Sequence, residues 1–392
     1  MKNLPIAPLL SLAALCVGSA ASAADEPATG VFQLRAAAGI EHDSNVLRQN
    51  SGEITDNVGM LSVGLKADKR LGLQRLRADV EATEYKYRDQ SQLDYHTINY
   101  SAAWDWSLTP RFHGVLSADR RQYREVATDS ITFANRIGRR TERTEILEGM
   151  YEVGAAWRAL AGVTHTASES TEPRSWDASP RVRSARVGVG YETPKGTLLT
   201  LRARHGTGEY TDPTPGAAAG DFKERELELA LKWPVTVKTG VEARLAHISR
   251  DHAIAPQLDF SGMVGGASIN WEVTAQTRLI AGYAHDLVAS GLLTGGHVQT
   301  DRIYFTPVWQ VLPHIALNAR YDRSERRWKD VPAPGTDAGR NETVETAGIG
   351  LDWDPRPAFT VSTSVRGEKL KSSLPASSYK ATVLAVAVKA RF

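Results

Sequence analysis

The last thirteen residues of the chain, KATVLAVAVKARF (380–392), decide the fold. From residue 382 on, polar or small residues alternate with apolar ones, which are Leu384, Val386, Val388, Ala390 and Phe392. Alternation with a period of two is typical of a strand with one apolar face. A chain end in water is usually polar and frayed, so a terminal Phe in phase with this face indicates a strand that lies against lipid.

The same alternation recurs along nearly the whole chain. Clear cases are YHTINYSAAWDWSL (95–108), ERELELALKW (224–233) and HIALNARYDR (314–323). We identify about eighteen such segments of about ten residues, the length of a tilted membrane-spanning strand. Their centres lie near Leu34, Val63, Val80, Tyr100, Leu116, Val153, Val163, Val187, Leu201, Leu229, Ala243, Ala267, Ala281, Phe305, Leu317, Ile349, Val361 and Val386. The segment near Val163 alternates poorly, and its loss would leave sixteen.

The connections between these segments alternate between short turns and long polar loops. Short turns include KRLGL (69–73), LTPR (108–111) and TPKG (193–196), and long loops include 123–143, 169–181, 209–223 and 328–342. Outer-membrane barrels have short periplasmic turns, long outer loops and an even strand count. A soluble sandwich or propeller would also alternate, but it has no reason for this asymmetry. We therefore predict an all-β, transmembrane, antiparallel up-and-down barrel of about 18 strands, with 16 as the alternative.

Tryptophans support this prediction because they sit at segment ends, mostly just before a short turn, as an interfacial girdle requires. They are Trp104, Trp106, Trp157, Trp233, Trp271, Trp309 and Trp353. No loop stands out as an inward-folded constriction, although residues 124–141 are long enough to form one.

The N-terminus predicts a cleaved secretory signal at residues 1–23. Lys2 precedes an apolar core, and Ala21-Ser22-Ala23 is a small-residue cleavage site. The single Cys16 lies in the signal, and Leu15 before it disfavours lipidation. We expect one barrel domain over 24–392, without disulfides, in the bacterial outer membrane.

If the apolar faces meet lipid, the opposite faces line a lumen. The charged candidates for this lining are Arg75, Arg77, Asp79, Glu81, Arg202, Arg204, Glu226, Glu228, Glu242, Arg244, Arg302, Arg320, Asp322, Arg366 and Glu368. Opposed rows of charge would create a transverse field and offer hydrogen bonds to a polar solute. Tyrosines could add flat surfaces for sugar rings, and the candidates are Tyr85, Tyr87, Tyr95 and Tyr304. The simpler interpretation is that the charges pair with one another and the tyrosines mark interfaces.

Catalytic and metal-binding patterns are scarce. A net charge of +2 without a basic stripe gives no reason to expect nucleic acid. His247-Ile248-Ser249 resembles the His-x-Ser of outer-membrane lipid deacylases, which are much smaller barrels. Asp43 and Asp56 could bind calcium in an outer loop, but a solvated polar loop is the simpler interpretation. We expect no enzyme activity, no cofactor and no metal.

A family resemblance enters through GIEHDSNVLRQNSGEITDNVGMLSVGL (39–65) and continues through residues 75–125. Its motif is Asp43-Ser44-Asn45-Val46-Leu47-Arg48, with one extra residue before the arginine. This stretch resembles the exopolysaccharide-biosynthesis outer-membrane proteins of the EpsL type, within the "putative β-barrel porin" group. The resemblance implies an outer-membrane component of exopolysaccharide biosynthesis and export, with Asp43, Asn45 and Arg48 as the family motif.

Three functions stay open at this point. The resemblance favours a pore for an exopolysaccharide chain, the same lumen would serve a porin for small solutes such as sugars, and a blocked lumen would make a structural partner of an export complex. The partners expected are outer-membrane lipid, the polymer, periplasmic polysaccharide-export proteins and the barrel-assembly machinery. That machinery would recognise the C-terminal signal formed by Leu384, Val386, Val388 and Phe392.

Overall fold

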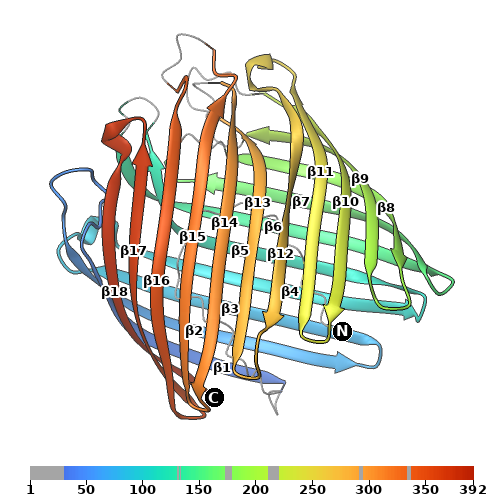
Figure 1. The fold of residues 1–392 in the computed structure, drawn as a ribbon, viewed down its shortest axis with the longest axis horizontal. Helices are drawn as coiled ribbons and strands as arrows, with labels where there is room; N and C mark the ends of the chain where they lie inside the picture. The colour runs from blue at the N-terminus through green and yellow to red at the C-terminus, as the bar shows by residue number, and fades with distance from the viewer. Residues whose placement is uncertain are drawn as a thin grey trace.

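The computed structural model describes residues 31–129, 132, 134–172, 179–210, 220–290, 295–332 and 337–392. The signal expected at 1–23, with Cys16, lies outside the described residues. From Val31 onward, the described part of the chain forms one closed antiparallel β-barrel of 18 strands (Figure 1). No helix long and apolar enough to cross a membrane occurs in this part.

The strands follow one another around the barrel in chain order. They are β1 (Phe32–Asp43), β2 (Asp56–Leu71), β3 (Gln74–Tyr87), β4 (Tyr95–Thr109), β5 (Phe112–Thr128), β6 (Asn135–Val153), β7 (Trp157–Ser170), β8 (Pro180–Glu192), β9 (Leu198–Tyr210), β10 (Phe222–Thr236), β11 (Thr239–His252), β12 (Phe260–Glu272), β13 (Thr277–Ala289), β14 (His297–Leu312), β15 (Ile315–Lys329), β16 (Asn341–Arg356), β17 (Phe359–Ser372) and β18 (Tyr379–Arg391). Three single-turn 3₁₀ helices lie in the loops: η1 (Ser91–Leu93), η2 (Pro256–Leu258) and η3 (Pro375–Ser377).

The barrel closes where the last strand pairs with the first. Arg35 lies opposite Arg391, and the register runs to Asp43 opposite Val383. Phe392 extends this ladder, because its N–H donates to the carbonyl of Leu34 at 2.9 Å and its carbonyl accepts from the Leu34 N–H at 3.0 Å. The Phe392 side chain is 68% exposed on the outer wall. The terminal aromatic therefore completes a lipid-facing surface, and closure leaves no open sheet edge.

The two ends of the barrel differ. Eight connections of two to five residues join strands at the end that carries the described chain termini, and the longer ones lie at the other end. Six tryptophans are exposed near the short-turn end: Trp104, Trp157, Trp233, Trp271, Trp309 and Trp353. The barrel thus has a girdle at one rim and long loops at the other, as outer-membrane barrels do.

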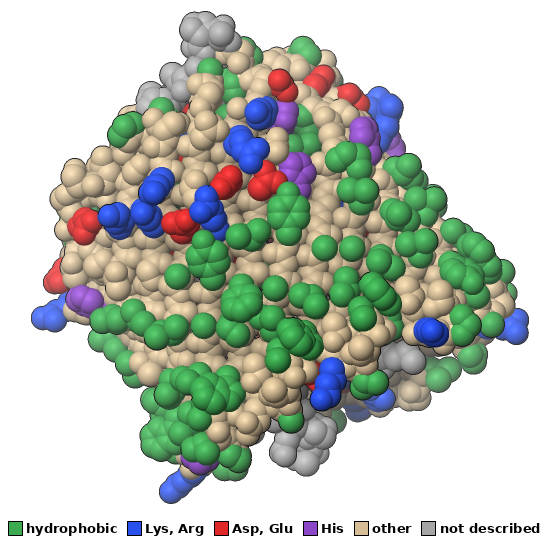
Figure 2. Space-filling model, viewed as in Figure 1, with side chains coloured by type: hydrophobic (Ala, Val, Ile, Leu, Met, Phe, Trp, Pro, Cys, Tyr) green, Lys and Arg blue, Asp and Glu red, His purple; other side chains and the backbone are tan. Residues whose placement is uncertain are grey.

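The outer wall carries a belt of exposed apolar side chains. In β10, Leu227, Leu229, Trp233, Val235 and Val237 follow one another on this face or at its turn. The step from Leu227 to Val237 spans about 33 Å along an extended chain, or about 23 Å after a 45° tilt, close to the height of the apolar band of such barrels. Figure 2 shows hydrophobic side chains over the lower and right-hand part of this face, with charged side chains gathered above them.

The strand prediction is confirmed with two corrections. Each of the eighteen predicted centres falls in a different strand, and the weak segment near Val163 is a full strand, so the sixteen-strand alternative is wrong. Val153 is the last residue of β6 rather than its centre, and residues 123–143 are mostly strand rather than a long loop. This stretch escaped detection because both of its faces are polar.

Candidate functional site: the lumen and its outer mouth

All fifteen charged candidates lie on the inner wall, on the opposite face of their strands from the exposed apolar side chains. In β10, Glu226 and Glu228 alternate with the exposed Leu227 and Leu229. The same phase places the other candidates of β3, β9, β11, β14, β15 and β17 inside. Their role as the lining of a solute path remains a prediction.

The most continuous set of inner charges crosses β9, β10 and β11. Nη1 of Arg202 donates to Glu228 at 3.0 Å, and Nε of Arg204 donates to Glu226 at 3.1 Å. From the other side, Arg244 approaches Glu228 at 2.9 Å and Glu226 at 3.4 Å. Each of these two carboxylates therefore lies between two guanidinium groups, in an arrangement that we call the charge ladder.

Most of the remaining candidates also have a partner of opposite sign, on the same strand or on a nearby one. Arg77 contacts Asp105 at 2.8 Å, Nε of Arg75 donates to Asp68 at 2.9 Å, and Asp79 pairs with Arg35. Arg302 donates to Asp322 at 3.0 Å, Arg320 lies 3.5 Å from the same carboxylate, and Glu242 lies 3.4 Å from Lys232. Cations and anions thus interleave locally, rather than forming opposed rows across the lumen.

The lumen narrows at the long-loop end because the β5–β6 hairpin leaves the wall. Pairing of β4 with β5 ends at Tyr100 opposite Arg120, whereas β5 and β6 stay paired as far as Thr128 opposite Asn135. Val126 then packs against the inner-wall cluster Val344, Leu370 and Tyr379 of β16, β17 and β18. Since those strands lie on the far side of β1 from β5, the hairpin tip crosses the mouth; in Figure 1 the blue-green tip lies beside the red ends of β17 and β18.

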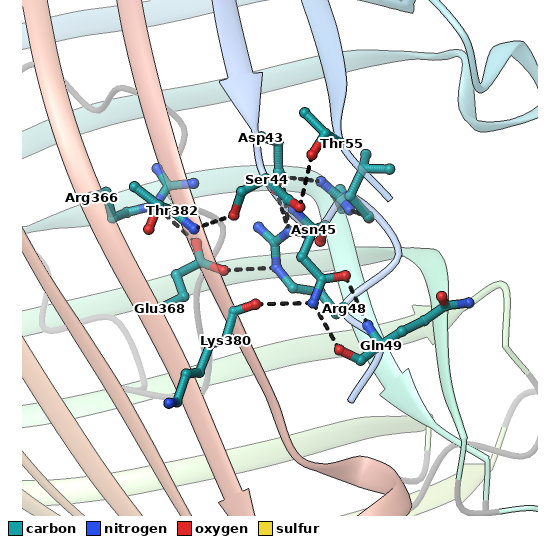
Figure 3. A network of polar contacts seen from close by, with 12 residues as sticks. Asp43, Ser44, Asn45, Arg48, Gln49, Thr55, Arg366, Glu368, Lys380 and Thr382 are labelled. Carbon is teal, nitrogen blue, oxygen red and sulfur yellow. Dashed lines mark hydrogen bonds and ion pairs between the residues drawn. The ribbon is translucent and has the colours of Figure 1, made fainter. Parts of the chain in front are cut away.

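A second segment folds inward next to this hairpin. Residues 44–55 connect β1 to β2 and carry Asn45 and Arg48, and Asp43 is the last residue of β1. Figure 3 shows these three motif residues converging at the end of β1. Nη1 of Arg48 donates to the two oxygens of Asp43 at 2.7 and 2.8 Å, and its Nε donates to Glu368 of β17 at 2.9 Å. Glu368 also accepts from Arg366 at 2.8 Å. We call the Asp43–Arg48–Glu368 cluster the latch.

The backbone of the loop is shaped to present Arg48 to these acids. The side chain of Asn45 donates to the carbonyl of Gln49 at 2.7 Å and to that of Lys380 in β18 at 2.9 Å. Arg48 has a φ of +54°, an unusual conformation for a residue with a side chain. The guanidinium is 3% exposed. Burial lowers the pKa of Arg48, but Glu368 and Asp43 more than offset this effect and raise the pKa above its ordinary value.

Loop 44–55 and the hairpin tip are bonded to each other. Arg124 of β5 donates to the carbonyl of Val46 and lies 3.5 Å from Asp43. Asn135 of β6 donates to the carbonyl of Arg48 at 2.7 Å and to that of Ser377 at 2.9 Å. The two segments therefore form one crossbar over this part of the mouth.

These contacts change the interpretation of several predicted residues. Asn45 is fully buried, so Asp43, Asn45 and Arg48 hold the crossbar together within the wall and mouth. Tyr85 and Tyr95 stack on each other with centroids 4.5 Å apart, and Tyr87 belongs to a buried cluster with Val46. Sequence reasoning missed Arg124, Val126 and Asn135, and the length of 124–141 was the one signal that pointed to them.

The remaining candidate sites are structural or unsupported. Both oxygens of Asp56 accept hydrogen bonds from backbone N–H groups of residues 89 and 90, which is a structural role. No group of three or more potential metal ligands occurs among the described residues. The side chain of His247 contacts Ser261 of β12 at 3.2 Å, and His247 and Ser249 both point away from the lumen.

Comparison with known proteins agrees with this architecture. Residues 235–392 match the family described as "Putative beta-barrel porin 2". This is the C-terminal part of the chain, whereas the EpsL-type resemblance rested on the N-terminal part; no finding supports its link to exopolysaccharide. No curated protein matches the chain.

Two solved structures of OpdK from Pseudomonas aeruginosa, one of them titled "with Vanillate", have the same fold. Each aligns with a TM-score of 0.51 and 10% identity over 92% of this chain and 99% of that chain. An identity this low shows the fold alone. The chain is thus an 18-stranded, porin-like outer-membrane β-barrel whose C-terminal strands match a β-barrel porin family.

Proposed function

We propose that the protein is an outer-membrane channel for small polar or charged solutes. The observation that carries this proposal is a closed barrel whose inner wall carries interleaved Arg and carboxylate side chains and whose outer wall is apolar. Such a wall replaces the water of a polar solute with hydrogen-bonding groups of both signs.

The lumen is wide enough for a solute to pass, and the crossbar limits the size of that solute. Eighteen strands about 4.8 Å apart and tilted by about 40° enclose a backbone radius of about 18 Å, which leaves room for water inside the side chains. The crossbar restricts the outer mouth with buried ion pairs and hydrogen bonds. A short solute can pass beside such an obstruction more easily than a long polymer, which must occupy the mouth continuously.

The charge ladder suggests the solute class. Three arginines face two shared glutamates across β9–β11, so the ladder offers guanidinium groups that a carboxylate or a sugar hydroxyl can engage in turn. Since a barrel of the same fold has been solved with vanillate, small organic acids are the first solutes to test beside neutral sugars.

Exopolysaccharide export is the competing proposal, and the resemblance of residues 39–125 is its support. A blocked lumen that serves as a structural partner is the third. Deletion of the gene separates export from uptake: our proposal expects unchanged surface and secreted polysaccharide together with slower uptake of a small polar solute.

Reconstitution provides the direct test. The purified barrel in planar bilayers should give single-channel currents, and proteoliposomes should swell in mono- or disaccharides faster than in a long oligosaccharide. Glu226→Gln combined with Glu228→Gln should make the channel more anion-selective, because Arg202 and Arg244 then lose their carboxylate partners while Arg204 keeps only Glu224. Folded protein without any current would contradict a channel and favour the structural role.

A further inference from the structure

The outer wall has a hollow that the channel function does not use. It lies over β8–β11 on the long-loop side of the apolar belt and has two parts. Its floor is apolar and includes Ala185, Ala203 and Leu227, and its rim is formed by His205, Arg225 and His247. All six side chains alternate with inner-wall residues, so the hollow faces outward.

The hollow follows from side-chain size. Two alanines lie on neighbouring strands among larger belt residues such as Leu201, Leu229 and Leu245, so the surface is depressed between them. Leu227 is the belt residue of β10 nearest the long-loop end, and Arg225 is the next outward-facing residue toward that end. Since the belt below spans the height of the lipid core, Arg225 lies at the level of the outer headgroups.

The rim has donors without acidic partners. Cross-strand pairing places Arg225 beside His205 on one side and Ser249 on the other. Among the described residues, the side chains of Arg225 and His205 make no ion pair or hydrogen bond, and His247 contacts the hydroxyl of Ser261. In β15, by contrast, the outward Arg323 is neutralised, because it pairs with Glu325 at 2.6 Å and with Glu345 at 3.2 Å.

We propose that this hollow binds a phosphorylated lipid of the outer leaflet. The alanine-lined floor accommodates an acyl chain at the belt, and Arg225 and His205 donate hydrogen bonds to a phosphate oxygen above it. An unpaired guanidinium at the headgroup level gains most from a phosphate, because the pair is charge-assisted and partly shielded from water. A phosphorylated lipid has an apolar chain below an anionic headgroup, and this hollow has an apolar floor below a cationic rim.

The test uses the folded barrel in a neutral detergent and native mass spectrometry. The probes are lipid A with two phosphates and the same lipid after enzymatic dephosphorylation. We expect the bisphosphorylated form to be retained and the dephosphorylated form to be lost. His205→Gln combined with Arg225→Gln should weaken retention at least ten-fold, whereas Arg225→Lys should keep most of it.

The control is Arg323→Gln, which removes an outward arginine at the same level that already has acidic partners. It should leave retention unchanged. The proposal is overturned if the double variant and the control retain lipid equally, or if both lipid forms bind alike. It is also overturned if millimolar inorganic phosphate displaces the lipid completely, since the rim would then serve a soluble anion. Heat-modifiable migration on gels verifies that each variant is folded.

Discussion

Replacing Arg48 with alanine tests whether the latch holds loop 44–55 in the mouth. The guanidinium donates to Asp43 at 2.7 and 2.8 Å and to Glu368 at 2.9 Å while only 3% exposed. Removing one member of a buried ion pair costs about 3–5 kcal/mol, because the remaining charge lacks a partner. Here Arg124 and Arg366 still lie near the two acids, so we use the lower value.

A loss of about 3 kcal/mol corresponds to a factor of about 150 in the equilibrium between closed and open loop. The barrel wall keeps its own ladders, so the change should be local. The N–H of Val46 donates to Ile54 and that of Arg48 to Asn45, and both bonds break when the loop opens. Hydrogen exchange of peptides covering 44–55 should therefore accelerate about 100-fold, with exchange in β9–β11 unchanged.

The matched control is Arg75→Ala, which removes a lumen arginine paired with Asp68 near the short-turn end. It should leave exchange in 44–55 unaltered. If Arg48→Ala changes that exchange by less than about three-fold, the buried ion pairs do not hold the loop and the reasoning fails.

Four further results are expected. Replacing the tip 124–135 by a short turn should raise single-channel conductance, since the crossbar then loses Arg124, Val126 and Asn135; equal conductance would contradict a restricting role. Glu226→Gln with Glu228→Gln should shift the reversal potential in a salt gradient toward anion selectivity, with outward-facing Glu345→Gln as control. Gly114→Ala should destabilise the barrel by about 1–3 kcal/mol in urea titrations of heat-modifiable migration, because the added Cβ collides with the Glu148 carbonyl oxygen, whereas the Cβ of Gly240→Ala meets nothing within 4 Å. Deleting Phe392 should leave export to the periplasm intact but reduce outer-membrane insertion in cell fractionation, since the ladder to Leu34 is lost.

The wall of the barrel could be predicted from the sequence because lipid imposes a simple rule on it. Each wall strand must place apolar residues at every second position, as Leu384, Val386 and Val388 do, and the inner face is then polar by elimination. The alternation of turn lengths gives the orientation in the same way. Both signals are local in the sequence, so they can be recognised without knowing which residues of neighbouring strands pair.

The crossbar could not be predicted because neither of its faces meets lipid. Arg124 and Arg140 form hydrogen bonds with protein groups on opposite faces of the hairpin. Polar residues therefore occur at odd and even positions alike, and the sequence pattern predicts a loop instead of a strand. The ion pairs of the charge ladder could not be predicted either. Arg244 lies at most 18 residues along the chain from Glu226 and Glu228, but which residues face each other depends on the strand register, and the whole barrel sets that register. Burial of Arg48 follows from chain closure, which a motif alone does not reveal.

The position of the latch explains why it is built from residues so far apart in sequence. β18 offers mainly small apolar side chains to the lumen beside β1, with Ala381, Val383, Ala385 and Ala387 all buried. This seam joins the first strand of the barrel to the last one, and its β18 side is largely apolar. Arg48 reaches β17 through Glu368, and Asn45 reaches β18 through the carbonyl of Lys380, so loop 44–55 clamps the seam as well as the mouth. A gate that opened at this loop would also loosen the closure of the barrel. We therefore expect movement that admits a solute to occur in the hairpin tip, with loop 44–55 staying in place.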